Sequence, residues 1–290
     1  MKYYILFNPL AGMGSSSGRL DSLKIEENGE KVFYDITNDG GYEKLLSDLG
    51  TDDKIVICGG DGTVNRFING IKDLEINNDI LYFAAGSGND FMNDMNLKPS
   101  TEPIKINEFI ENLPTVTIKG KIYKFLNGVG LGVDGFVCAE ISRLREIKQK
   151  KVSYIPVALK ALFKCYTPTK ATVTVDGETN TYSKVWMAAT MKGRFFGGGM
   201  MIAPDQDRFD SDNLITSIVA HNLSKFKILS LFLLIFKGKH TKYTQYVAMK
   251  KCHEIKVEFD RPATIQIDGE TIEDVVSYTV LAKAKKSLHT

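Results

Sequence analysis

The sequence predicts two domains, an α/β domain with a mostly parallel sheet followed by an all-β sandwich. Up to about Pro114, strand-like apolar runs alternate with helical segments, which is typical of a parallel sheet covered by helices. Beyond Pro114, β-branched residues in period-two alternation predominate, which favours an antiparallel sandwich. We therefore expect domains over residues 1–114 and 115–282, with the tail 283–290 as a candidate for completing the first domain.

In the first domain, each expected strand is a short apolar run that ends in a turn. Strands are expected at residues 3–7, 31–36, 55–58 and 80–85, and helices at residues 42–49, 64–71 and 91–95. Glycine-rich turns follow the strands at 3–7, 55–58 and 80–85. Ligands of such sheets bind beyond the carboxyl ends of the strands, so we expect these turns to share one crevice.

In the second domain, β-branched runs mark the strands, and turns such as Asp176-Gly177 separate them. Strands are expected at residues 115–118, 171–175, 185–190, 214–219, 254–259, 264–267 and 275–281. Helical segments interrupt this pattern at residues 136–150 with 155–165, and again at residues 225–236.

The composition excludes several classes of protein. The chain has 290 residues, of which 43% are hydrophobic and 25% charged, as in globular proteins. A net charge of +2 gives no overall basic field, which argues against nucleic acid as a partner. The cysteines and histidines are scattered without metal-ligand spacing, which indicates free thiols in a reducing compartment. The N-terminus does not read as a signal peptide, and the longest apolar run falls far short of the ~20 residues that span a bilayer, so we expect a cytoplasmic protein.

The most informative motif is Gly59-Gly60-Asp61-Gly62-Thr63, between a strand and a helix. Glycines let a backbone approach a phosphate closely, and the N–H groups of the turn and helix start point at the anion. The lone carboxylate of Asp61 is out of place there unless it faces a metal ion that accompanies the phosphates. The alternative is a tight strand-to-helix turn with an acidic helix cap. The whole run in this context favours phosphate binding.

Other glycine-rich segments are ambiguous when each is taken alone. The loop from Asn8 to Gly14 and the turn Gly86-Ser87-Gly88-Asn89-Asp90 could line a nucleotide pocket or simply connect strands to helices. The run 130–135 matches GxGxxG, but a basic stretch replaces the acid that a dinucleotide site needs about twenty residues later. Asp268-Gly269-Glu270 is typical of a hairpin turn.

In combination, these motifs resemble the diacylglycerol kinase catalytic-domain family over essentially the whole chain. Asn8-Pro9, the GGDGT turn, a GSGNDF turn at residues 86–91 and a late Asp-Gly-Glu occur in the family's order and spacing. GGDGT alone is shared with NAD kinases, whereas the other two motifs are more specific. The family includes bacterial soluble lipid kinases and sphingosine and ceramide kinases. The resemblance implies a phosphofructokinase- and NAD-kinase-like α/β domain and a β-sandwich, with ATP and Mg²⁺ bound in the cleft between them.

The resemblance also implies roles for individual residues. Glu270 would be the general base, and Asp61 and Asp90 would organise the catalytic Mg²⁺ through water. A structural metal loop would use Asp210, Asp212 and the carbonyl of Leu214. The residues expected to contact ATP are Asn8, Thr37, Gly59, Gly60, Asp61, Gly62, Thr63, Val64, Asn65, Arg66, Ser87, Gly88, Asn89 and Asp90.

The chain departs from the family pattern at three places. Arg66 stands where glutamate is usual, and Thr117 stands where an aspartate normally joins the Mg²⁺ network. The metal loop is usually a compact Asp-Asp-Gly-Leu, but here it reads Asp-Ser-Asp-Asn-Leu at residues 210–214 and is longer. The first two departures affect substrate detail and Mg²⁺ affinity, and the third weakens the case for a structural metal.

We therefore expect an ATP- and Mg²⁺-dependent lipid kinase that phosphorylates diacylglycerol or a related lipid to phosphatidic acid or its analogue, a step of phospholipid biosynthesis. Two alternatives stay open, an NAD-kinase-like enzyme with a soluble substrate and a nucleotide-binding regulator without turnover. Basic residues beside apolar ones at 143–163 and 225–239 can place the chain peripherally on a membrane, although each segment alone also fits a solvated face of a core helix. A homodimer is among the assemblies left open.

Overall fold

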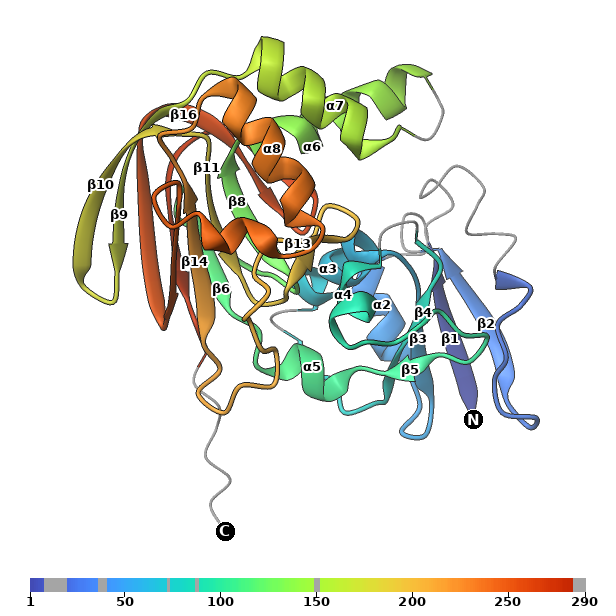
Figure 1. The fold of residues 1–290 in the computed structure, drawn as a ribbon. Coiled ribbons are helices and arrows are strands. Elements are labelled where there is room, and N and C mark those ends of the chain that lie inside the picture. The colour runs from blue at the N-terminus through green and yellow to red at the C-terminus, as the bar shows by residue number, and fades with distance from the viewer. Residues whose placement is uncertain (8–19, 36–40, 72–73, 87–88, 149–151, 284–290) are drawn as a thin grey trace. The chain divides into compact units, whose positions relative to one another are not determined.

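The structure, a computed structural model, describes residues 1–7, 20–35, 41–71, 74–86, 89–148 and 152–283 (Figure 1). The chain divides into two compact units, residues 1–111 and 112–290. The first is an α/β unit and the second an antiparallel β sandwich, so the expected fold class is confirmed. The proposed contribution of the tail lies outside the described residues from residue 284 onwards.

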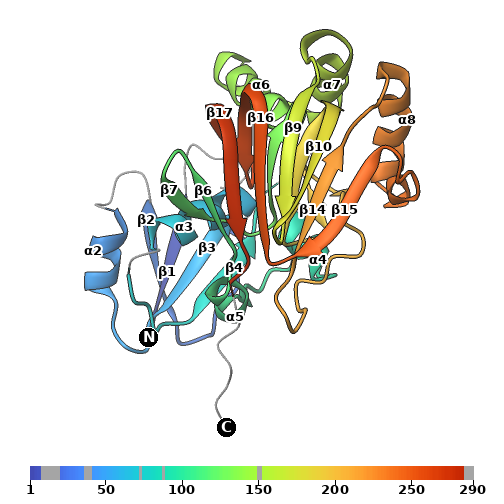
Figure 2. The ribbon, with the colours of Figure 1, turned by 90° about the vertical axis from the view of Figure 1, so that its left-hand side faces the viewer.

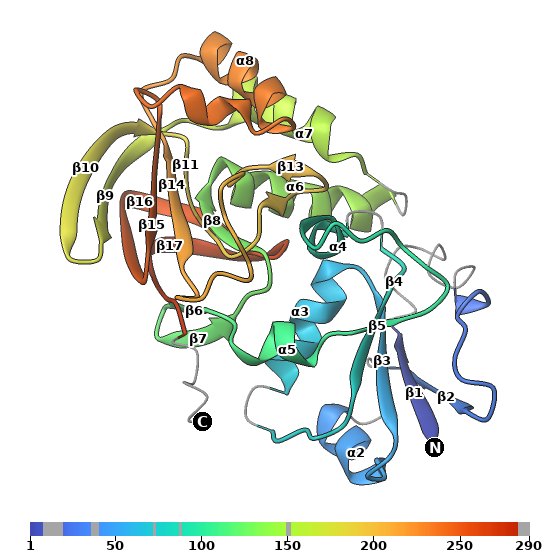
Figure 3. The same cartoon turned by 60° about the horizontal axis from the view of Figure 1, so that its bottom comes forward.

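The N-terminal unit is built on one mostly parallel sheet. Its described strands are β1 (Lys2–Phe7), β2 (Glu30–Asp35), β3 (Lys54–Gly59), β4 (Ile80–Ala84) and β5 (Ile104–Lys105), and its described helices are α2 (Gly41–Asp48), α3 (Asp61–Gly70), α4 (Asp90–Asp94) and α5 (Asn107–Glu111). The strand order is β2-β1-β3-β4-β5, with β1 to β4 parallel and β5 antiparallel to β4 (Figure 3). Ile55, Val56 and Ile57 in the central strand β3 are completely buried, as the continuous apolar run predicts.

Helices α3 and α4 begin earlier than the sequence predicts, because each includes the aspartate of the preceding turn. Asp61 lies in the first turn of α3, and Asp90 lies in the first turn of α4. A carboxylate is favourable there because the first turn carries the positive end of the helix dipole and unpaired N–H groups. The two motif aspartates therefore sit at helix starts, directly beyond the carboxyl ends of β3 and β4.

The C-terminal unit is dominated by one large antiparallel sheet that folds over itself (Figure 2). The described strands are β6 (Thr115–Ile118), β7 (Lys121–Lys124), β8 (Gly128–Gly132), β9 (Thr169–Val175), β10 (Glu178–Val185), β11 (Met187–Met191), β12 (Phe195–Phe196), β13 (Met200–Met201), β14 (Ile215–Ala220), β15 (Val247–Cys252), β16 (Glu254–Ile267) and β17 (Glu270–Leu281). The long strand β16 joins the two layers, because its first half pairs with β9 and its last residues pair with β8. An apolar core fills the space between the layers.

A second apolar cluster lies between this sheet and a group of helices along one of its sides (Figures 1 and 2). The helical elements are α6 (Val133–Lys148), α7 (Tyr154–Lys160), the π-helical turn η2 (Ala161–Cys165), α8 (Lys225–Ile235) and the 3₁₀ turn η3 (Lys239–Lys242). Within the described part of the chain, none of the helices is long and apolar enough to cross a membrane.

The GxGxxG run at residues 130–135 is explained by packing in this unit. A Cβ on Gly130 would lie 1.7 Å from Oδ2 of Asp134, and one on Gly135 would lie 2.1 Å from the carbonyl oxygen of Thr264. Gly132 has a φ of +122°, which side chains rarely tolerate. The glycines therefore allow β8 and α6 to pack closely in an antiparallel sandwich, which is not the setting of a dinucleotide fingerprint.

Candidate functional site

Two of the expected glycine-rich turns lie against each other at the carboxyl ends of β3 and β4. The amides of Ala85 and Gly86 donate to the carbonyl of Gly59 at 2.9 and 3.1 Å. A Cβ on Gly86 would lie 2.4 Å from Cα of Gly60, so the two backbones meet too closely for any larger residue. The turns at 59–62 and 86–90 thus share one location, as expected from the parallel sheet.

Asp61 links these two turns through its carboxylate. Oδ2 accepts a hydrogen bond of 2.6 Å from the amide of Asp90, and Oδ1 accepts one of 3.4 Å from the amide of Phe91. These are N–H groups at the start of α4, which otherwise have no partner within the helix. A carboxylate has about four acceptor positions, so capping α4 is compatible with a further contact to a metal-bound water. Asp61 thus caps α4, whereas the acidic-cap alternative expected a cap on α3, whose N-cap residue Gly60 has no side-chain capping bond.

The carboxylates of Asp61 and Asp90 create a negatively charged region beside the turns. Asp90 is only 5% exposed. Burial raises the pKa of Tyr82 well above its usual value, and the charges of Asp61 and Asp90 add to this rise. Mg²⁺ in kinases is commonly held by one or two carboxylates together with substrate phosphates and water. The described residues include no cluster of three or more His, Cys, Asp or Glu that could hold a metal, but this pair fits an ion that arrives with a nucleotide.

The other residues expected at ATP differ in their accessibility. Val64 is fully buried in α3 and Asn65 is nearly so, whereas Arg66 is exposed on the same helix. Gly60 and Gly62 are partly exposed, and Thr63 donates its amide to the carbonyl of Gly60 at 2.9 Å. Side-chain contact with a nucleotide is therefore open to Arg66 but not to Val64. Asn8, Thr37, Ser87 and Gly88 lie outside the described residues.

In the C-terminal unit, Glu270 is the first residue of β17, directly after the turn between β16 and β17. Asp268, which has a φ of 48°, fixes this turn. Its carboxylate accepts hydrogen bonds from the amides of three consecutive residues, Leu126 at 2.5 Å, Asn127 at 2.8 Å and Gly128 at 2.9 Å. The hairpin expected from Asp-Gly is present, and Asp268 is a structural anchor that holds the start of β17 in place.

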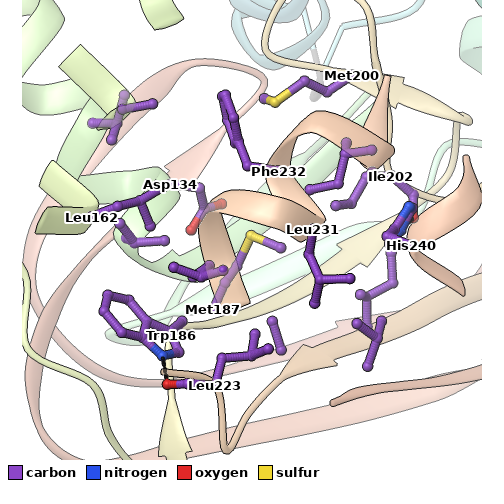
Figure 4. A pocket seen from close by; sticks show the side chains of 18 of the residues that line it. Asp134, Leu162, Trp186, Met187, Met200, Ile202, Leu223, Leu231, Phe232 and His240 are labelled. Atoms are coloured by element: carbon purple, nitrogen blue, oxygen red, sulfur yellow. Dashed lines mark hydrogen bonds between the residues drawn. The ribbon is translucent and has the colours of Figure 1, made fainter. Parts of the chain in front are cut away.

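Sequence reasoning missed an apolar pocket in the C-terminal unit (Figure 4). It lies between the sheet and the helices, with about 710 Å³ of space free of protein atoms, part of it open to solvent. Apolar side chains line nearly all of it, among them Trp186, Met187, Leu231 and Phe232. No local pattern predicts this pocket, because its walls are spread over residues 133–247, on helices α6, α7 and α8 and on strands β11 to β15, among other segments.

Among the described residues that line this pocket, Asp134 alone carries a carboxyl group. It is 2% exposed, and among the described residues its Oδ1 has no hydrogen-bond partner. Oδ2 receives one long hydrogen bond, 3.4 Å, from Nε2 of Gln266. Burial raises the pKa of Asp134 from 3.8 to about 7. Near neutral pH a large share of Asp134 therefore carries a proton and offers a hydrogen-bond donor within an apolar wall.

We expect Asp134→Asn to remove a pH-dependent loss of stability. Because folding raises this pKa, the contribution of Asp134 is most favourable below pH 3.8 and is lost as the pH rises towards about 7. The full loss is on the order of 4 kcal/mol. Denaturant unfolding from pH 4 to 8 should show the variant gaining free energy of unfolding relative to the wild type. Parallel pH profiles for the two proteins would contradict this expectation. His240, which also lines the pocket, titrates in both proteins and cancels in the comparison.

The loop expected to bind a structural metal has a different arrangement. The carbonyl of Leu214 accepts a hydrogen bond of 2.9 Å from Nε2 of Gln206. Oδ1 of Asp210 accepts the amide of Asp212 at 2.8 Å, and the Asp212 side chain is exposed. The expected ligands are thus engaged in the loop's own hydrogen bonds or face solvent.

Two family models match the chain, one for each unit. The model described as the diacylglycerol kinase catalytic domain matches residues 2–119, and the model described as the YegS C-terminal NAD kinase beta sandwich-like domain matches residues 127–284. Together they account for most of the sequence, and the second alone covers more than half of it.

Similar proteins are named as lipid kinases or diacylglycerol kinases. The chain is 24% identical over 290 residues to the YtlR protein of Bacillus subtilis (strain 168), whose name assigns it provisionally to the lipid kinases, across 92% of this chain and 93% of YtlR. It is 27% identical over 273 residues to a diacylglycerol kinase of Mycobacterium tuberculosis, across 89% of this chain and 85% of that protein. A solved structure of a diacylglycerol kinase from Bacillus anthracis superposes with a TM-score of 0.63 at 17% identity, covering 97% of this chain and 94% of that one, which shows a common fold.

Proposed function

This chain belongs to the diacylglycerol kinase catalytic-domain family, and we propose that it is an ATP- and Mg²⁺-dependent kinase of a glycerolipid hydroxyl, most simply that of diacylglycerol. The observation that carries this proposal is the pair of glycine-rich turns joined by Asp61, whose carboxylate lies 2.6 Å from the amide of Asp90. A backbone open to phosphate and two adjacent carboxylates form the combination that a metal–nucleotide complex requires.

Each group has a specific part in the proposed reaction. The amides of the turns and the start of α3 would neutralise phosphate charge, while Asp61 and Asp90 would hold the Mg²⁺ that accompanies ATP. Mg²⁺, when bound, supplies charge stabilisation for the phosphoryl group in transfer. A lipid hydroxyl is a poor nucleophile at neutral pH, so Glu270 would accept its proton as the phosphoryl group moves. Phosphatidic acid is the product when diacylglycerol is the acceptor.

The apolar pocket of the C-terminal unit supports a lipid as the acceptor. Its lining suits an acyl chain, since burying each CH₂ group contributes roughly 0.8 kcal/mol. Asp134, whose pKa burial raises to about 7, could in its protonated form donate a hydrogen bond to an ester or hydroxyl oxygen of the lipid. The described residues that line the pocket include no lysine or arginine that could pair with the phosphates of a nicotinamide dinucleotide.

We also propose that this unit works at the cytoplasmic membrane surface and contacts it through α8 and its neighbours. Helix α8 is apolar on both sides: Ile228, Leu231 and Phe232 face the interior, while Phe226 is 81% exposed and Leu233 is 65% exposed. Lys225 and Lys227 lie in the first turn of α8, and Lys237 and Lys239 follow its end. Nζ of Lys225 donates to the carbonyl of Phe163 at 2.7 Å, which ties α8 to η2. Exposed apolar side chains beside basic ones bind anionic lipid through both burial and charge.

The membrane proposal predicts the behaviour of a double variant, Phe226→Glu with Leu233→Glu. Both side chains are exposed, so the fold should survive, while binding to vesicles of phosphatidylglycerol and phosphatidylcholine should fall at least about tenfold. Sedimentation with the vesicles measures this. Ile122→Glu is the matched control, because Ile122 is 54% exposed on β7 of the same unit. Equal loss of binding in the control and the double variant would show that α8 is not the contact.

A single assay tests the proposed activity. The protein is incubated with γ-labelled ATP and Mg²⁺ in mixed micelles of diacylglycerol, monoacylglycerol or a sphingoid base, and separately with NAD. We expect label in diacylglycerol and at most weak labelling elsewhere. Label in NAD alone would refute the lipid proposal, and no label in any arm would favour a nucleotide-binding regulator.

A further inference from the structure

We propose that a network of buried side chains around Gln206 and Lys192, rather than a bound metal ion, holds the loop of residues 205–214 in the C-terminal unit. The family resemblance implies a structural metal at this loop, with Asp210, Asp212 and the Leu214 carbonyl as ligands. In the structure, the uncharged side chain of Gln206 donates to the Leu214 carbonyl, and the positively charged Lys192 donates to the neighbouring Asn213. The inference rests on family membership and does not depend on the proposed kinase activity.

The side-chain amide of Gln206 binds the Leu214 carbonyl oxygen, which is the backbone ligand that the metal would need. Its side chain is almost completely buried, at 4% exposure. Nε2 donates to the carbonyl of Leu214 at 2.9 Å and to the carbonyl of Asp207 at 3.2 Å, and Oε1 accepts the hydroxyl of Thr216. Both ends of the amide are therefore hydrogen-bonded, to carbonyls of the loop and to Thr216 of β14, and the Leu214 carbonyl has a hydrogen-bond donor from this chain.

Lys192 supplies a positive charge of its own beside the middle of the loop. It is 3% exposed, and its Nζ lies 2.5 Å from Oδ1 of Asn213. Asn213 has a φ of 58° and donates its Nδ2 to the carbonyls of Asn112 and Lys283. The Asn213 side chain thus connects the loop to Asn112 at the beginning of the unit and to Lys283 near its end. The Lys192 ammonium orients this side chain.

Two carboxylates of the loop accept hydrogen bonds from backbone amides of the loop itself. Oδ1 of Asp207 accepts the amide of Phe209 at 2.9 Å, and Oδ1 of Asp210 accepts the amide of Asp212 at 2.8 Å. The described part of the chain contains no group of three or more potential metal-ligating side chains of the His, Cys, Asp or Glu type. The ammonium of Lys192 next to Asn213 would repel a divalent ion placed at the neighbouring Leu214 carbonyl. These residues therefore do not fit the metal that the resemblance implies.

The direct test is the effect of divalent ions on thermal unfolding of the full chain without nucleotide. After dialysis against EDTA, we expect the Tm to be the same as before dialysis and the same after addition of Mg²⁺ or Ca²⁺. Elemental analysis of protein purified in the presence of both ions should find neither in stoichiometric amount. A Tm that falls with EDTA and recovers with one equivalent of either ion would overturn the proposal. Because no kinase assay is involved, failure here is distinct from failure of the proposed activity.

Variants test whether the hydrogen bonds of Gln206 and Lys192 stabilise the fold. Gln206→Met and Lys192→Met keep the side-chain length but leave buried polar partners unpaired, so each should lower the Tm by about 4 °C or more. Neither loss should be recovered by Mg²⁺ or Ca²⁺. Lys250→Met is the control, since Lys250 is 47% exposed in a surface ion pair with Glu178. If Lys192→Met fails to fold, Gln206→Met carries the test. Tm values equal to that of the control would overturn the proposal.

Discussion

Asp61→Asn is expected to lower kcat by on the order of 10³-fold while the protein stays folded. The amide oxygen of asparagine can still accept the hydrogen bond that Asp90 donates at 2.6 Å, so the contact between the two turns is largely kept. What the substitution removes is a negative charge next to Asp90, and with it much of the attraction for Mg²⁺. The loss should appear in kcat measured with Mg²⁺–ATP in excess, and higher Mg²⁺ should restore part of it.

Comparison with two other variants separates the charge from the capping role. Asp61→Ala removes both, so it should lose activity and also about 1 kcal/mol of stability, as for a lost helix cap. Asp48→Asn changes an exposed carboxylate at the end of α2 in the same unit and should behave as the wild type. An Asp61→Asn enzyme with near-normal kcat would mean that Asp61 only holds α4, and the metal assignment would then be wrong.

The fold was predictable where a strand is defined by its own side chains. The residues of β3 form a continuous apolar run because the strand is covered on both faces, and its position follows from that run alone. Strands β8 and β10 were not predicted for opposite reasons. β8 is a glycine-rich run, which resembles a loop, yet every one of its residues is buried. β10 is polar and mostly exposed, so it lacks the alternation by which strands are recognised.

The candidate site was predictable only in part, because local motifs specify a turn and not its partners. The GGDGT and GSGND turns can be identified from their glycine-rich sequences, and the parallel sheet brings them together. The anchoring of Asp268 on the amides of residues 126–128 joins segments far apart in the chain, and no pattern near either segment indicates it. The burial of Lys192 and Gln206 also could not be predicted, because the sequence around a buried lysine does not distinguish it from an exposed one. Motif residues can be assigned from sequence, whereas the groups that position them require coordinates.

Glu270→Gln is expected to lower kcat by about 10² to 10⁴-fold, the usual contribution of a general base. Glutamine has the same shape and can occupy the same place at the start of β17, so KM for ATP should change little. The loss should therefore appear in kcat, measured with Mg²⁺–ATP and lipid in excess, and not in the affinity for ATP.

Two further substitutions distinguish a base from a residue that only shapes the hairpin. Glu273→Gln alters an exposed carboxylate on the same strand and should leave kcat unchanged. Asp268→Asn keeps Glu270 but weakens the bonds to the amides of Leu126, Asn127 and Gly128 that hold its turn. It should therefore lower both kcat and Tm. If Glu270→Gln instead lowers the Tm and leaves kcat near that of the wild type, Glu270 serves the fold and another group must accept the proton.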